Sequence, residues 1–139
     1  YAKAAGRQKT PPAFDGVDLS TGENQLFGTN TVDKRHFTAF SMQHNTASNA
    51  EIADEETIKI MNPLNYIGKP GVNLPQNWRI RVGTNDRDTS LAVSAVLAAK
   101  LQNNGQTVDY ALPWDVGHGG DYDLDDLFTW MKQVSSSTK

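Results

Sequence analysis

The pattern of apolar and polar positions is most regular in the second half of the chain. Trp78–Val82 and Val108–Leu112 alternate apolar and polar residues, which is typical of short strands. Between them, the strongly apolar run Leu91–Leu101 predicts a helix, and Gly105 is well placed just past its end. A last helix is expected from about Asp123, with its apolar residues on one stripe. Strand, helix, strand and helix joined by short polar loops predict a βαβ unit in a parallel sheet.

The first half of the chain has a weaker pattern. We expect a helix over Asp33–Thr46, with Asp33 as its N-cap, and a second helix over Glu51–Met61 that Asn62-Pro63 ends. Residues 1–32 carry repeated glycines and prolines without a lasting period, so we expect an irregular segment that is a functional loop or an insertion. Because two parallel strands cannot form a sheet buried on both faces, the βαβ unit requires further strands beside it.

Composition narrows the class of protein. The chain has 139 residues, the length of one ordinary domain, and a net charge of −3. It has no basic cluster and no apolar run long enough to span a bilayer, so we expect neither a nucleic-acid nor a membrane partner. The absence of cysteine excludes disulfides and thiolate chemistry, and it is compatible with a cytoplasmic or a secreted protein. The three histidines have no metal-ligand spacing, and we expect neither a metal nor a cofactor.

Two loop motifs follow the two predicted strands. Gly83-Thr84-Asn85-Asp86-Arg87-Asp88 comes after the first strand, and Gly117-His118-Gly119-Gly120 comes after the second. Loops that leave the carboxyl ends of parallel strands meet at one edge of a sheet, so Asp86 and His118 are expected there together. A histidine that moves a proton and a carboxylate that orients it are two members of a Ser-Asp-His triad. The order Asp then His is that of the α/β-hydrolase fold, and the flanking glycines are expected to allow a tight turn.

Simpler interpretations of these motifs exist. A lone Gly-His-Gly is common in ordinary loops, and an aspartate after a strand often caps a helix or forms a turn. Asp88-Thr89-Ser90 could cap the following helix. The triad is favoured because both motifs occur together, in the order Asp then His, each directly after a predicted strand. However, no Gly-x-Ser-x-Gly turn occurs in the sequence, so the nucleophilic serine has no candidate here.

The motifs resemble the C-terminal part of bacterial tannase-like and feruloyl-esterase-like α/β hydrolases. The stretches that carry the resemblance are Gly83–Ser90, Leu112–Trp114, Gly117–Tyr122 and Met61–Ile67. The resemblance implies an α/β fold in which parallel strands flanked by helices form the C-terminal portion of a hydrolase core, incomplete without an upstream segment. Residues 1–32 would then end a lid-like insertion, and residues 33–139 would be the C-terminal half of the core.

The resemblance also implies roles for individual residues. His118 would be the general base and acid, and Asp86 would orient it. Asp88 would bind a phenolic hydroxyl of the acyl group, with Lys9 and Glu23 gripping the other hydroxyls. For Lys9 and Glu23, a solvated surface pair is an equally good interpretation. The serine would come from an upstream segment of the same protein, and the substrate would be a small phenolic ester.

The sequence therefore predicts a segment of a serine esterase that hydrolyses galloyl or feruloyl esters. The alternatives are a general carboxylesterase or peptidase of the same fold, or a non-catalytic, degenerate hydrolase module that only binds. The chain starts at Tyr1 with neither a methionine nor a signal peptide. A trimmed terminus would explain this start, and the motif content favours a proteolytic fragment of a larger polypeptide.

Overall fold

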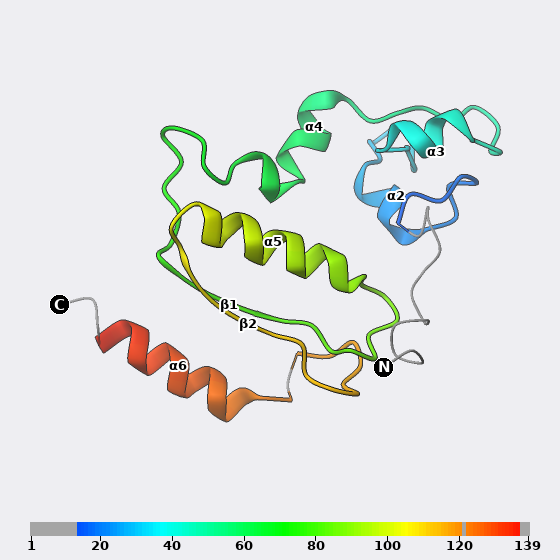
Figure 1. Cartoon of the computed structure of the whole chain (residues 1–139). Helices are drawn as coiled ribbons and strands as arrows, with labels where there is room; N and C mark the ends of the chain where they lie inside the picture. The colour runs from blue at the N-terminus through cyan, green and yellow to red at the C-terminus, as the bar shows by residue number, and fades with distance from the viewer. Residues whose placement is uncertain (1–13, 121, 137–139) are drawn as a thin grey trace. The chain divides into compact units, whose positions relative to one another are not determined.

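A computed structural model of the chain describes residues 14–120 and 122–136 (Figure 1). They form two compact units, which we call the N-terminal unit (residues 14–69) and the C-terminal unit (residues 70–136). From the sequence we predicted a boundary at position 32, between the end of a lid-like insertion and the C-terminal half of a hydrolase core. The compact units do not test that division, and the lid-like role of residues 1–32 stays a prediction.

The C-terminal unit has the predicted order of strand, helix, strand and helix. The elements are β1 (Asn77–Arg81), α5 (Leu91–Asn103), β2 (Thr107–Ala111) and α6 (Leu124–Ser136). The two strands pair in parallel, with Trp78 opposite Val108 and Arg79 opposite Asp109. The α/β arrangement expected from the alternating pattern is therefore confirmed for this unit.

The ends of α5 follow from local chemistry. The Ser90 side chain accepts a hydrogen bond from the Ala92 N–H at 3.3 Å and caps the first turn. Gly105 has a φ of +83°, a left-handed conformation that glycine adopts without a steric penalty. The predicted end of this helix at the glycine is confirmed.

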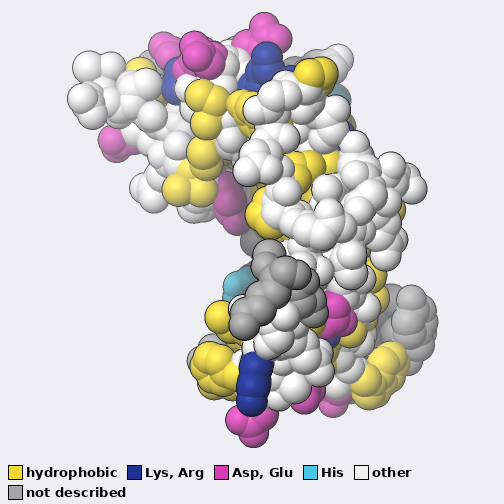
Figure 2. All heavy atoms as spheres, turned by 90° about the vertical axis from the view of Figure 1, so that its left-hand side faces the viewer, with side chains coloured by type: hydrophobic (Ala, Val, Ile, Leu, Met, Phe, Trp, Pro, Cys, Tyr) yellow, Lys and Arg dark blue, Asp and Glu magenta, His cyan; other side chains and the backbone are white. Residues whose placement is uncertain are grey.

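The two helices of the C-terminal unit lie on opposite sides of the strand pair (Figure 1). On the α5 side, the Ser94 and Tyr110 hydroxyls are 3.1 Å apart, and Leu101 is fully buried. Alternate positions on the strands point the other way and place Arg79, Arg81 and Asp109 on the α6 side. Several large apolar side chains nevertheless reach the surface, as Figure 2 shows for one face of the molecule.

The N-terminal unit consists of short helices joined by loops. They are α2 (Gly22–Leu26), α3 (Ala39–Gln43), α4 (Glu55–Ile60) and the 3-10 turn η1 (Pro63–Asn65). The glycines and prolines had predicted an irregular segment before residue 33. The structure instead has the short helix α2 in this segment, so the segment is not wholly irregular. Among the described residues of both units, no helix is long and apolar enough to cross a membrane.

The predicted helix over Asp33–Thr46 is wrong in its first half. His36 forms a parallel bridge with Ile52, in which the His36 N–H donates to the Glu51 carbonyl at 2.8 Å. Helix α3 starts only at Ala39, and Thr38, not Asp33, is its N-cap. Pairing with a distant segment overrides the local helical pattern here.

The second predicted helix starts later than expected. Ile52 takes part in the bridge, so the helix begins at Glu55 instead of Glu51. Asp54 is the N-cap, and its side chain accepts hydrogen bonds from the Thr57 N–H and hydroxyl, each at 2.8 Å. The predicted end at Asn62-Pro63 is confirmed, because Met61 is the C-cap.

Candidate functional site

Asp86 and His118 come from the two loops that follow the two strands. Asp86 lies in the aspartate turn (residues 83–90) after β1, and His118 lies in the histidine loop (described residues 112–120 and 122–123) after β2. Since β1 and β2 run parallel, both loops leave the same edge of the sheet. The His118 Nδ1 atom lies 3.0 Å from Asp86 Oδ2, which is a hydrogen-bond distance. The expected proximity is confirmed, while the catalytic roles stay predictions.

The backbone of the aspartate turn holds the Asp86 carboxylate in place. Oδ1 accepts hydrogen bonds from the Asp88 N–H at 2.7 Å and from the Thr89 N–H at 2.9 Å. Burial alone would raise the pKa of Asp86, but these two N–H groups and the His118 ring together bring the pKa below its ordinary value. Asp86 is therefore ionised near neutral pH, with its second oxygen directed at the imidazole.

The carboxylate determines which nitrogen of His118 carries the proton in the neutral ring. An ionised carboxylate can only accept, so Nδ1 donates to Asp86 and Nε2 keeps its lone pair. The His118 side chain is 61% exposed, whereas that of Asp86 is 7% exposed. The pair thus has a buried orienting group and an accessible ring that can accept a proton.

Close backbone contact fixes the histidine loop against the aspartate turn. The Asn85 N–H donates to the Val116 carbonyl at 2.9 Å. A Cβ atom at Gly83 would lie only 2.1 Å from that same carbonyl oxygen, so only glycine fits at this position. Our sequence analysis had assigned the tight turn to the glycines beside His118. The backbone does turn there, since the Gly119 N–H donates to the Gly117 carbonyl at 3.1 Å. However, none of these glycines has a positive φ and a Cβ there would meet nothing within 4 Å, so this turn does not require glycine.

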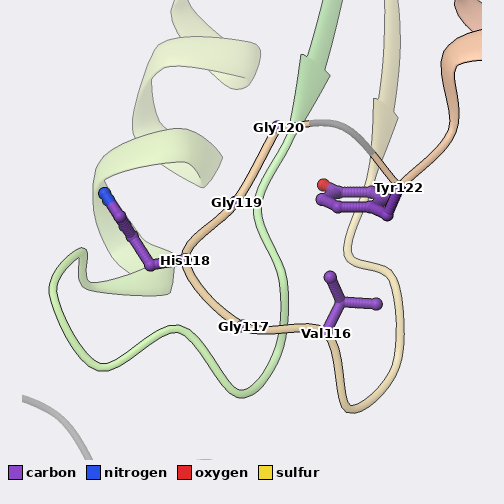
Figure 3. A pocket seen from close by; sticks show the side chains of 6 residues that line it. All are labelled: Val116, Gly117, His118, Gly119, Gly120 and Tyr122. Carbon is purple, nitrogen blue, oxygen red and sulfur yellow. The ribbon is translucent and has the colours of Figure 1, made fainter.

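A pocket of about 270 Å³ opens beside the Asp86–His118 pair. Residues of the aspartate turn and the histidine loop line it, together with Arg81 and Val82. A second, more open hollow of about 400 Å³ is lined by Val116, the glycines around His118 and Tyr122. In Figure 3 the His118 side chain points to one side of this glycine run, and the Val116 and Tyr122 side chains lie on the other.

Asp88 lies near the pair on the solvent side. One ligating atom each from Asp86, Asp88 and His118 all fall within 4.8 Å of one another, and the Asp88 side chain is exposed. A carboxylate there can accept a hydrogen bond from a hydroxyl group held beside the imidazole. The same three donors could also hold a cation, a grouping that our search for histidine spacing missed. The Asp-x-Asp sequence of the turn was the available signal.

The structure does not test the other two predicted binding residues. Lys9 lies outside the residues that the structure describes. Glu23 lies half-buried in the first turn of α2, in the N-terminal unit. Their roles in substrate binding stay predictions.

An ion-pair cluster beside the site was not predicted from the sequence. Its members are Arg79, Arg81, Asp109 and Asp123. The arginines alternate along β1, which indicated only the polar face of a strand. Their pairing with Asp123 becomes visible only when the chain returns to the sheet after the histidine loop.

This site and the parallel strand pair define a segment of an α/β protein with a paired aspartate and histidine. The chain is similar to the tannase of Lactobacillus plantarum, with 47% identity and a TM-score of 0.85 over 91% of this chain and 27% of that one. It is also similar to a Fusobacterium nucleatum tannase, with 48% identity and a TM-score of 0.80 over 91% and 27% of the two chains. No family model and no curated protein matches the sequence.

A third solved structure, a tannin acyl hydrolase in complex with ethyl gallate, shows 47% identity and a TM-score of 0.84 over 91% of this chain and 27% of that one. The chain is therefore a tannase-like segment. It spans about a quarter of the length of the tannases that it matches.

Proposed function

We propose that this chain is the C-terminal part of an α/β-hydrolase-type serine esterase that cleaves esters of phenolic acids. The observation that carries the proposal is the 3.0 Å contact between His118 Nδ1 and Asp86 Oδ2 in a chain 47% identical to a tannase. The solved complex of such an enzyme with ethyl gallate supports a phenolic ester as the substrate. The nucleophilic serine would lie on a segment upstream of Tyr1.

In the proposed reaction, the serine oxygen attacks the ester carbonyl carbon while Nε2 of His118 takes the serine proton. The imidazolium, stabilised by Asp86, gives this proton to the departing alcohol oxygen, and an acyl-serine remains. Water then attacks the acyl carbon in the same way and releases the phenolic acid. Asp88 would accept a hydrogen bond from a phenolic hydroxyl of the acyl group, with Lys9 and Glu23 as further partners.

The test is to co-express the chain with the upstream segment and to assay methyl gallate and methyl ferulate. We expect hydrolysis, and we expect His118→Ala or Asp86→Asn to lower kcat by about 10⁴-fold, as loss of such groups does in serine hydrolases. His44→Ala is the matched control, because His44 is exposed and lies in the other unit at the end of α3.

The outcomes separate the alternatives. Full activity of the His118→Ala variant would falsify the proposed triad. A preference for simple alkyl esters or peptides over galloyl esters would select a general carboxylesterase or peptidase. An upstream segment without a serine in a Gly-x-Ser-x-Gly turn would indicate a non-catalytic module.

A further inference from the structure

Both ends of the histidine loop are attached to the segment that carries Asp86. At its start, the Thr84 N–H donates to the Pro113 carbonyl at 2.9 Å, and the Thr84 hydroxyl accepts from the Asp115 N–H at 2.7 Å. Thr84 is buried, with 5% of its surface exposed. These contacts fix the first half of the loop relative to Asp86. They do not hold the half that follows His118.

The second half of the loop is held by Asp123, the last residue before α6. Its Oδ2 atom lies 2.6 Å from Arg79 Nη2 and 3.5 Å from Arg81 Nε. The side chains of both arginines and of Asp123 are mostly buried, with 10%, 17% and 19% of their surface exposed. Both arginines belong to β1, the strand that leads directly into the aspartate turn.

The arginines are themselves fixed before they meet Asp123. Arg79 Nη1 lies 2.6 Å from Asp109 Oδ2 on the neighbouring strand, and Arg81 Nη2 contacts both Asp109 oxygens at 2.8 and 2.7 Å. Burial alone would lower the pKa of Arg79, but the hydrogen bond to Asp123 and the charges of the two aspartates keep the pKa above its ordinary value. Asp109 thus holds both arginines, and Asp123 completes a partly desolvated cluster of two positive and two negative charges.

The role inferred for Asp123 rests on the proposed function. We propose that Asp123 is a positioning residue for the esterase reaction, because its bond to Arg79 fixes the end of the histidine loop and so keeps His118 on Asp86. His118 is exposed and its neighbouring glycines have open space around them. The attachments at the two ends of the loop, together with the contact to Asp86, therefore position the ring. The competing role for Asp123 is helix capping, since its carbonyl accepts the Leu127 N–H at 2.9 Å.

Kinetics of the chain assembled with its upstream segment distinguish the two roles. Asp123→Asn keeps the backbone acceptor and the side-chain size but removes the charge that Arg79 binds. We expect kcat on methyl gallate to fall by about 10- to 100-fold with KM changed less than threefold, because a misplacement of about 1 Å can cost this much. Asp123→Glu should recover part of the loss. Asp125→Asn is the matched control, since Asp125 is exposed in the first turn of α6.

An NMR measurement on the same assembly tests the positioning without catalysis. If only this chain carries ¹⁵N-histidine, just three imidazoles are visible, those of His36, His44 and His118. The His118 Nδ1 proton should exchange slowly in the wild type and in Asp125→Asn, and much faster in Asp123→Asn. If Asp123→Asn does not fold, Arg79→Lys is the milder variant, because it keeps the charge but loses the two-pronged geometry.

The proposal is overturned if Asp123→Asn leaves both kcat and the exchange of this proton as in the wild type. It is also overturned if Asp125→Asn causes equal losses, which would indicate a general effect on α6. If the wild-type assembly does not hydrolyse methyl gallate, the proposed function fails, while the exchange of the Nδ1 proton still decides whether Asp123 positions His118.

Discussion

At the scale of single residues, the absence of a side chain at Gly83 decides where His118 lies. The atoms that a Cβ would meet are the Val116 carbonyl at 2.1 Å for oxygen and 2.6 Å for carbon, and the Gly117 carbonyl oxygen at 2.7 Å. These are backbone atoms, which cannot rotate away as the end of a flexible side chain can. Gly83 thereby couples the exit of β1 to the loop that presents the histidine.

Gly83→Ala should therefore push the histidine loop away from Asp86. We expect the esterase activity of the assembled protein to fall by about 100-fold or more, because displacements near 1 Å at a reacting group have effects of this size. The assay on methyl gallate measures this loss. Gly22→Ala is the control, since a Cβ there meets nothing within 4 Å. Unchanged activity of Gly83→Ala would show that the close approach does not set the position of His118.

At the scale of elements, local signals predicted most of the C-terminal unit. Alternation in β1 and β2, the serine at the start of α5 and the glycine after its end each act within a few residues. The N-terminal unit was predicted less well, because its order depends on contacts between distant residues. His36 pairs with Ile52, and Asp15 binds groups more than twenty positions away, such as Thr38. No local pattern contains such partners.

The same contrast applies to the candidate site. The strand order and the two motifs were sufficient to bring Asp86 and His118 together. The role of Gly83 and the link from Arg79 to Asp123 could not be predicted, because each depends on how closely two returning segments approach. Sequence spacing predicts that two loops meet at one edge, but not which atoms touch there.

Asp15 links several short elements of the N-terminal unit. Its buried carboxylate accepts hydrogen bonds from the side chains of Asn24 in α2 and of His36, each at 2.7 Å. It also accepts from the Phe37 N–H at 2.9 Å and from the Thr38 N–H and hydroxyl, each at 2.7 Å. Through these five bonds Asp15 holds α2, the His36 bridge and the start of α3 in one arrangement. An uncharged amide at this position cannot accept all five.

Asp15→Asn should lower the free energy of unfolding by about 3–5 kcal/mol, because buried donors that lose their acceptor cost about 1–3 kcal/mol each. Urea unfolding, followed by a probe in the N-terminal unit such as hydrogen exchange of α3, measures the change. Asp18→Asn is the control, because Asp18 is exposed and should matter little. An equal effect of the two substitutions would contradict the central role of Asp15.

The stability supplied by Asp15 should depend on pH with a defined sign. Burial would raise the pKa of Asp15, but His36, Thr38, Phe37 and Asn24 together bring the pKa below its ordinary value. A carboxyl group of this kind stabilises the fold above its unfolded pKa of about 3.9, and the contribution is lost as the pH falls through the lower folded value. The difference between wild type and Asp15→Asn in urea unfolding should therefore be constant near neutral pH and shrink below pH 4. A difference that stays constant down to pH 2 would argue against an ionised Asp15.

At the scale of the whole molecule, the C-terminal unit exposes more apolar surface than a self-contained domain would. Leu124, Phe128 and Met131 share one stripe of α6 and are 43%, 61% and 47% exposed. Val93 and Val96 on α5 are 54% and 53% exposed. A contiguous exposed stripe of this kind is typical of a contact surface. Among the residues that the structure describes, β1 and β2 pair only with each other, and the matched tannases are nearly four times as long as the matching part.

We expect the stripe on α6 to pack against the upstream segment of the proposed esterase. Burying a phenylalanine side chain contributes about 1.5–3 kcal/mol, so Phe128→Ala should weaken the assembly by roughly 10- to 150-fold. Titration of the upstream segment into the chain, with recovered esterase activity as the signal, gives the dissociation constant. Thr129→Ala is the matched control, because Thr129 is exposed on another face of the same helix and alanine favours a helix at both positions. If the two variants assemble equally well, the stripe does not contact the upstream segment, and the apolar surface of α6 must serve another partner.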